Sequence, residues 1–340
     1  MKFHMHLLPT YYPGEDPPFD RYLQNVLELV VLAEELGFEG FWFTEHHFLP
    51  YGGPIPNPAV VMAAAAARTK TIRLGCGISI LPLHHPVQVA EDYAMVDAIS
   101  SGRLEFGIGG GNTQLDYAVY GVDRETRFGR FAEALDIIRG AWSQERFAHH
   151  GEVFQLPEFS IYPRPTQHPL PPIWVAGVSP EPFRWAGQQG FNVMTVSHPV
   201  PPARVQSAVT AWEEGLAAGG HSRATHHHKL NLRVWVDEDA GRAKEVGERA
   251  IRRYDEVSNV GRESRIGDML PSGDYDWEGM LRQARNIYGD PDQVIALLRQ
   301  AEATFRFDIA SVTMSYGAIP FEDTVRAMRL FAAEVMPKLR

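Results

Sequence analysis

A run of polar side chains that could do chemistry follows an apolar stretch near the start of the chain. Residues 41–43 are aromatic, and Thr44, Glu45, His46 and His47 come directly after them. An imidazole next to a carboxylate is suited to proton transfer, to metal binding or to a buried hydrogen-bonded pair. Neighbours on an extended segment point to opposite sides, and no third ligand at a metal-site spacing is evident, so we expect no metal site. We interpret His46 as a ligand-facing catalytic residue and Glu45 as its acidic neighbour.

Two other stretches are candidates for binding a flat or anionic ligand. Gly109 and Gly110 follow an apolar run, where they form either a tight turn or a surface that a ligand can approach closely. The second stretch precedes a predicted helix that begins with Pro180, and it consists of Ala176, Gly177, Val178 and Ser179. Free amides and the dipole at such a helix start favour a phosphate group. An arginine often completes a phosphate site, and Arg127 or Arg130 at another predicted helix start is suited to this role.

The remaining histidine clusters give weaker signals. They are the doublets at residues 84–85 and 149–150 and the triplet at 226–228, and all three lie in predicted loops. We interpret them as solvated loop residues and not as metal ligands.

Eight candidate strands alternate with helices along the chain. Apolar alternation and short apolar runs predict strands at residues 2–8, 40–44, 72–80, 104–108, 173–176, 193–196, 230–236 and 309–314. Helical spacing of apolar residues predicts helices at 22–36, 59–67, 87–99, 128–142, 205–217 and 294–304, one that begins at Pro180, and a last one that runs to about residue 337. This order predicts a single α/β domain over residues 1–340, a TIM-type (β/α)8 barrel.

Two stretches are too long for the regular barrel. The proline-rich residues 147–172 are expected to hold a small hairpin, and residues 241–288 are expected to form a helical insertion. A doubly wound open sheet is the main alternative fold, but residues 9–14 after the first strand are not a glycine-rich nucleotide-binding loop. In a barrel the carboxyl ends of all strands meet on one face, so His46 and the turn at residues 177–179 are expected on the same face.

The length, composition and net charge of the chain exclude several classes of function. The chain has 340 residues, of which 44% are hydrophobic and 22% charged, and its formal net charge is -10. This charge leaves no basic surface for nucleic acid or for anionic lipid. No apolar segment is long enough to span a membrane or has the form of a secretory signal, and the single Cys76 allows no internal disulfide. A cytoplasmic protein is therefore expected.

Together these stretches resemble the bacterial luciferase-like flavin monooxygenase family. Over residues 1–110 the chain is most similar to the luciferase α subunit, through the segments 37–48, 57–58, 75–82, 85–87, 90–92, 101–103 and 106–108. Beyond residue 110 the resemblance is to the wider family, through residues 127–138, 172–190, 290–294 and 335–337.

The resemblance implies a TIM barrel that binds reduced FMN, which a separate NAD(P)H:flavin reductase supplies. In the family the flavin reacts with O2 to give a C4a-hydroperoxide that oxygenates a small organic substrate. His46 matches the catalytic histidine near the flavin C4a, Glu45 matches its acidic neighbour, and Asn57 lies in a matching segment and is expected to contact the cofactor. Gly77 and Ile78 match a bulged strand end where a cis peptide supports the flavin. A homodimer is the family expectation.

This chain departs from luciferase in two places. Luciferase has a reactive cysteine and a phosphate-binding arginine where this chain has Gly109 and Gly110, so the FMN phosphate is expected to depend more on residues 177–179 and on Arg127. Residues 241–288 diverge and are expected to shape the substrate pocket. Two other functions stay open: an F420-dependent hydride-transfer enzyme of the same fold, and a non-catalytic flavin-binding protein or partner subunit.

Overall fold

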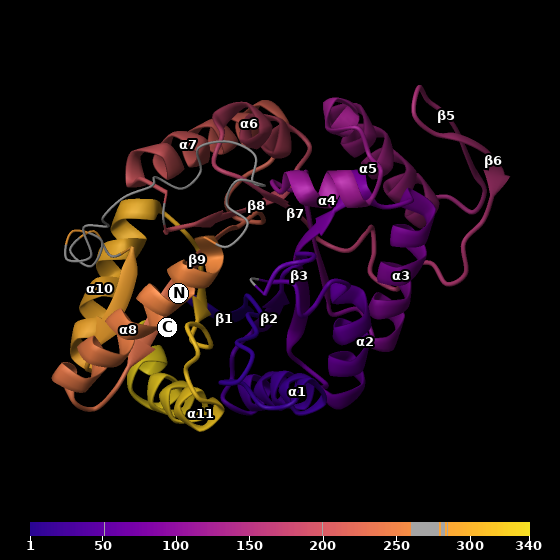
Figure 1. Ribbon diagram of the computed structural model, residues 1–340. Coiled ribbons are helices and arrows are strands. Elements are labelled where there is room, and N and C mark those ends of the chain that lie inside the picture. Colours follow the sequence, from indigo (N-terminus) through magenta and orange to yellow (C-terminus); the bar gives the residue numbers. More distant parts are fainter. Residues whose placement is uncertain (51, 199, 260–278, 280–282, 284) are drawn as a thin grey trace.

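A closed barrel of parallel strands lies at the centre of the computed structural model, with helices around it (Figure 1). The described residues are 1–50, 52–198, 200–259, 279, 283 and 285–340. Every neighbouring pair of barrel strands is parallel, and β9 closes the ring because it pairs with β8 on one side and with β11 on the other. The strands are β1 (Lys2–Leu7), β2 (Gly40–Phe43), β3 (Arg73–Ile80), β4 (Leu104–Gly109), β7 (Ile173–Ala176), β8 (Asn192–Val196), β9 (His228–Val236) and β11 (Ile309–Thr313). The predicted TIM barrel is confirmed.

The helices cover the outside of the barrel and follow the strands in the order that the sequence predicts. Several begin and end at the expected signals: Gly37 has a φ of 80° just after α1, and the Asp290 and Gln293 side chains form a capping box at the start of α10. The helices are α1 (Phe19–Glu35), α2 (Pro58–Arg68), α3 (Pro86–Ile99), α4 (Gln114–Val119), α5 (Arg127–Ser143), α6 (Pro180–Gln188), α7 (Pro202–Ala218), α8 (Ala240–Asn259), α10 (Pro291–Phe305) and α11 (Phe321–Leu330). None of the helices among the described residues has the length and apolar character needed to cross a membrane.

The barrel interior is filled by large side chains from alternate positions of the strands. Trp42, Trp174, Met194 and Ile309 form a buried cluster of their own, separate from the larger core between strands and helices. Gly75 makes this packing possible, because an added Cβ there would lie 2.3 Å from Cδ2 of Trp42. Gly75 in β3 therefore makes room for an indole.

The two long stretches, residues 147–172 and 241–288, differ in how well the structure matches the prediction. Residues 147–172 contain the expected hairpin, an antiparallel pair of β5 (Phe147–His150) and β6 (Gln155–Phe159). The helical insertion predicted at residues 241–288 begins as α8, but residues 286–288 at its end belong to a strand. After α8, the strand β10 (Asn286–Gly289) pairs in parallel with residues 233–236 of β9 and is fully buried. The rest of this stretch, 260–278, 280–282 and 284, lies outside the described residues.

Candidate active site

The residues after β2 form the polar tip that the sequence predicts at the carboxyl end of the barrel. Glu45 and His47 are buried, whereas His46 is only partly buried. The imidazole of His46 packs on the backbone of Gly52, where an added Cβ would lie 2.4 Å from Cδ2 of His46. Gly52 also has a φ of 74°, which favours glycine. The turn after β2 is therefore shaped around the His46 ring.

Glu45 organises the site through three hydrogen-bond donors. Its Oε1 lies 3.0 Å from Nε2 of His47 and 2.6 Å from Nε2 of His84, and its Oε2 accepts a 3.1 Å hydrogen bond from the amide of Ile80. Burial raises the pKa of the Glu45 carboxyl, but the hydrogen bonds from the two histidines outweigh this effect, so the pKa lies below its usual value. For His84 the two effects have the opposite signs. Burial lowers its pKa, but the hydrogen bond to Glu45 and the negative charge nearby together raise it by more, so the pKa of His84 lies above its usual value. The ionised Glu45 carboxylate thus holds the rings of His47 and His84 and the end of β3 in place.

This cluster contains a third potential metal ligand, His84, that the sequence did not reveal. Ligand atoms of Glu45, His47 and His84 all lie within 4.8 Å of one another. Two ligands of a tetrahedral zinc ion with bonds of about 2.0–2.1 Å are about 3.3 Å apart. The 2.6 Å between Glu45 and His84 is shorter and suits a direct hydrogen bond. The interpretation of residue 84 as a solvated loop histidine is wrong, and the absence of a metal stays a prediction.

The end of β3 forms an apolar floor beside this tip. The Gly77–Ile78 peptide bond is cis, as expected, and the pairing of β3 with β4 shifts register between Cys76 and Ser79. Ile78 and Ala176 are partly buried and pack on the tryptophan cluster inside the barrel. Gly109 accommodates Ile78, because an added Cβ would lie 2.2 Å from Cδ1 of Ile78.

Gly110 and Gly177 differ in how much open space lies beside the backbone. An added Cβ on Gly110 would meet nothing within 4 Å, and the Gly110 carbonyl accepts a hydrogen bond from the Tyr117 hydroxyl. Gly177 is exposed, but its amide donates to the Met194 carbonyl at 3.2 Å. Gly110 is therefore the position with open space beside the backbone.

Three arginines lie near the start of α5. The positive charges of Arg124, Arg127 and Arg130 all act on Tyr117, whose pKa burial nevertheless raises. Arg127 donates a 3.0 Å hydrogen bond to the Arg124 carbonyl, and its guanidinium lies 4.2 Å from the centre of the Phe128 ring. These guanidiniums make the region around Gly110 positive.

The start of α6 offers fewer amides than the sequence suggested. Ser179 is the exposed N-cap and its side chain makes no capping hydrogen bond. Pro180 and Pro182 carry no amide hydrogen, and Glu181 places a carboxylate in the first turn. Trp185 of α6 contacts Phe131 of α5 with ring centres 6.3 Å apart, so the two helices are neighbours. An anion here would depend on the arginines and the Ser179 hydroxyl more than on the helix dipole.

Asn57 has a structural role in this arrangement. Its side-chain oxygen accepts a hydrogen bond of 3.4 Å from the Val60 amide, and it is the N-cap of α2. The described contacts give it no further partner at the site, and its expected cofactor contact stays a prediction.

Helix α4 brings residues to the site that sequence reasoning missed. The Tyr120 hydroxyl lies 3.3 Å from Nδ1 of His47, and Asp116 is 1% exposed. Burial raises the pKa of Asp116 to about 6, against a lowering effect of His47. A short helix of six residues gives little periodicity to detect, although the Asp-Tyr pair after the glycines was a usable signal.

Comparison with known proteins decides the family. Residues 1–306 match the family model described as luciferase-like monooxygenase. The chain belongs to this family. Its sequence is 37% identical over 171 residues to the flavin-dependent trigonelline monooxygenase, oxygenase component, of Acinetobacter baylyi, covering 50% of this chain and 47% of that protein.

Two further relatives cover nearly the whole chain. The crystal structure of monooxygenase RslO1 from Streptomyces bottropensis superposes with a TM-score of 0.93 at 29% identity, covering 100% of both chains. The F420-dependent glucose-6-phosphate dehydrogenase of Kineococcus radiotolerans is 27% identical over 93% of each chain. The chain spans 47% to 66% of the length of the first curated relatives that it matches.

Proposed function

We propose that this chain is the oxygenase of a two-component system that uses reduced FMN and O2 to oxygenate a small organic substrate. A separate NAD(P)H:flavin reductase supplies the reduced flavin. The observation that carries this proposal is the polar tip after β2, where the partly exposed His46 is next to Glu45, whose carboxylate accepts a hydrogen bond from the Ile80 amide at the end of β3. The oxygenase component of the trigonelline monooxygenase supports the two-component arrangement.

The residues at the carboxyl end of the barrel fit a flavin. Ile78 and Ala176 offer an apolar floor for a flat ring system, and the open space at Gly110 allows close approach to the backbone. Arg127 and Ser179 would hold the phosphate. Reduced FMN supplies the electrons that activate O2 when it is bound.

The protein's own groups then have distinct tasks. His46 donates or accepts a proton at the reacting centre, because its ring is the partly exposed imidazole of the tip. Glu45 positions His47 and His84 and is a structural anion rather than the proton donor. The rings of Phe48 and Tyr120, which contact His47, would help to exclude water from the reaction. The expected assembly is a homodimer.

An F420-dependent hydride-transfer enzyme is the second candidate, because the glucose-6-phosphate dehydrogenase relative matches over 93% of the chain. Anaerobic titration separates the two candidates. We expect reduced FMN to bind more tightly than oxidised FMN or F420, and O2 to be consumed when NADH and a flavin reductase are added. Binding of F420 without any O2 uptake would favour the second candidate, and flavin binding without turnover would favour a non-catalytic partner subunit.

The substrate is best found by a screen. Aldehydes, ketones, terpenoids and sulfonates are tested with FMN, NADH and a reductase, and oxygenated product is scored against hydrogen peroxide. A true substrate raises product and lowers peroxide release in the same reaction.

A further inference from the structure

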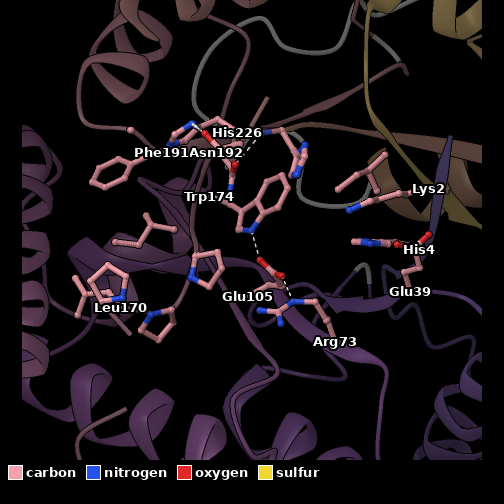
Figure 2. A pocket seen from close by; sticks show the side chains of 18 of the residues that line it. Lys2, His4, Glu39, Arg73, Glu105, Leu170, Trp174, Phe191, Asn192 and His226 are labelled. Carbon is pink, nitrogen blue, oxygen red and sulfur yellow. Dashed lines mark hydrogen bonds and ion pairs between the residues drawn. The ribbon is translucent and has the colours of Figure 1, made fainter. Parts of the chain in front are cut away.

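A cavity lies at the opposite end of the barrel from His46. It has a volume of about 510 Å³ and is bordered by the residues that begin β1, β3, β7, β8 and β11 (Figure 2). The layer of Trp42, Trp174, Met194 and Ile309 lies inside the barrel between this cavity and the carboxyl face. Active sites of TIM barrels lie at the carboxyl ends of the strands, so the proposed oxygenase reaction does not account for this cavity.

His4 presents a hydrogen-bond donor to the cavity. An indole nitrogen can only donate, so the 2.9 Å contact between Nε1 of Trp42 and Nδ1 of His4 makes Nδ1 an acceptor. Burial is the main cause that holds the pKa of His4 well below its usual value, and Lys229 and Lys2 lower it further. The neutral ring therefore carries its proton on Nε2, and this N–H is left for a ligand.

Lys2 adds an ammonium group, and His227 adds a ring nitrogen that has no hydrogen-bond partner. No residue in the described part of the chain forms an ion pair with Lys2. Burial is the main cause that lowers the pKa of the half-buried His227; the Asp308 carboxylate acts in the opposite direction, and Lys2 lowers it further. Nδ1 of His227 is buried without a hydrogen-bond partner, and the nearest carboxylate, that of Asp308, is 3.9 Å away. Asp308 itself already accepts hydrogen bonds of 2.8 Å from Arg223 and from the His228 amide.

The buried acid of the cavity is already neutralised. One carboxylate oxygen of Glu105 accepts from Nε of Arg73, and the other accepts a 2.5 Å hydrogen bond from Nε1 of Trp174 (Figure 2). Glu105 is thus already held by two other donors, although the positive charge of Lys2 also acts on it. The exposed Glu39 is the other acidic residue that lines the cavity. Its single negative charge is outweighed by the positive charges of Lys2 and Arg139, so the lining is positive overall. The whole chain, by contrast, has a net charge of -10.

The other wall of the cavity is apolar and stiff. Pro169, Leu170, Pro171 and Pro172 line it together with the rings of Trp174 and Phe191. Figure 2 shows Leu170 and Phe191 on the side away from Lys2 and His4. A ligand that suits both walls has an anionic end and a compact apolar body.

We propose that this amino-end cavity binds a small organic acid, with its carboxylate between Lys2, His4 and His227 and its apolar body against Leu170, Trp174 and Phe191. The site is separate from the flavin site, and the proposal stands whether or not the oxygenase function does.

Benzoate is the probe, and benzamide is the neutral control of the same shape. Calorimetric titration of the full chain is expected to show one saturable benzoate site and at least about tenfold weaker binding of benzamide. Lys2→Met removes the exposed cation and is expected to weaken benzoate at least about tenfold. His227→Phe removes the unpartnered ring nitrogen without changing Lys2 and is expected to weaken benzoate binding as well.

Two controls locate the binding. Lys70→Met changes an exposed lysine that does not line the cavity and is expected to leave the benzoate affinity unchanged. His46→Ala changes the carboxyl face and is also expected to leave it unchanged. The proposal is overturned by the absence of saturable benzoate binding, by equal binding of benzamide, or by a loss of binding in His46→Ala while both cavity variants bind normally.

Discussion

Lys229 is a buried lysine on β9. It is 1% exposed, its ammonium lies 3.9 Å from the centre of the Trp42 ring, and no residue among those described forms an ion pair with it. Burial lowers the pKa of Lys229 from 10.5 to about 7, although the negative charge of Glu105 acts in the opposite direction. The folded protein therefore disfavours the protonated form that the unfolded chain prefers.

The sign and size of the effect on stability follow from these two pKa values. Between pH 7 and pH 10.5 the unfolded chain holds a proton that the folded chain has lost, so the free energy of unfolding rises with pH. Burying this lysine costs about 4 kcal/mol at pH 7 and about 2 kcal/mol at pH 9. Lys229→Met removes that cost and also a cation–π contact worth about 0.5–2 kcal/mol. We expect the variant to be more stable by about 2–4 kcal/mol at pH 7, with the gain smaller by about 2 kcal/mol at pH 9.

Urea unfolding at pH 7, 8 and 9 measures this difference. The wild type and Lys229→Met are compared at each pH, so that other titrating groups cancel. Lys70→Met, at an exposed position, is the matched control and is expected to follow the wild type at every pH. A stability difference between wild type and Lys229→Met that does not change with pH, or a variant less stable than wild type at pH 7, would refute the reasoning.

Three further predictions concern the site and the barrel interior. His46→Ala is expected to fold and bind FMN but to oxygenate at least about 100-fold more slowly, and unchanged turnover would remove His46 from the mechanism. Glu45→Gln removes the charge that raises the pKa of His84, so the imidazole titration followed by NMR is expected to shift to lower pH; an upward shift would contradict this assignment. Gly75→Ala drives a methyl group into Trp42 and is expected to lower the free energy of unfolding by about 1–3 kcal/mol, whereas a neutral effect in urea unfolding would show that the indole can move aside.

The sequence predicts the barrel well because each strand carries its own signal. Short apolar runs mark all eight barrel strands, and parallel pairing follows from their alternation with helices. β10 was missed because a strand of four residues next to a long charged stretch has too little pattern of its own. Its partner is residues 233–236 of β9, which lie about fifty residues earlier in the chain and cannot be inferred from local periodicity.

The site was only partly predictable for a related reason. The sequence places His46 and Glu45 at a strand end, because this depends on local order alone. It does not reveal that His84 reaches Glu45 from 39 residues away. His228 shows the same limit. It was predicted to lie in a solvated loop, but it is the first residue of β9 and is 0% exposed. Its Nε2 lies 2.7 Å from the Thr195 hydroxyl.

The interior of this barrel is more polar than the branched apolar layers that usually fill the fold. His6 is 6% exposed with its Nδ1 unpartnered, and its Cε1 lies 3.5 Å from where a Cβ on Gly77 would be, so a polar ring lies directly under the cis segment. Lys229 lies on the Trp42 ring and lowers the pKa of His6, after the larger effect of burial. Groups that cost stability are typically retained where function needs them.

The packed tryptophan layer fills the space between the two ends of the barrel, and distant sites that share no partners act additively. Changes at Lys2 and at His46 are accordingly expected to combine without coupling, each altering the ligand at its own end.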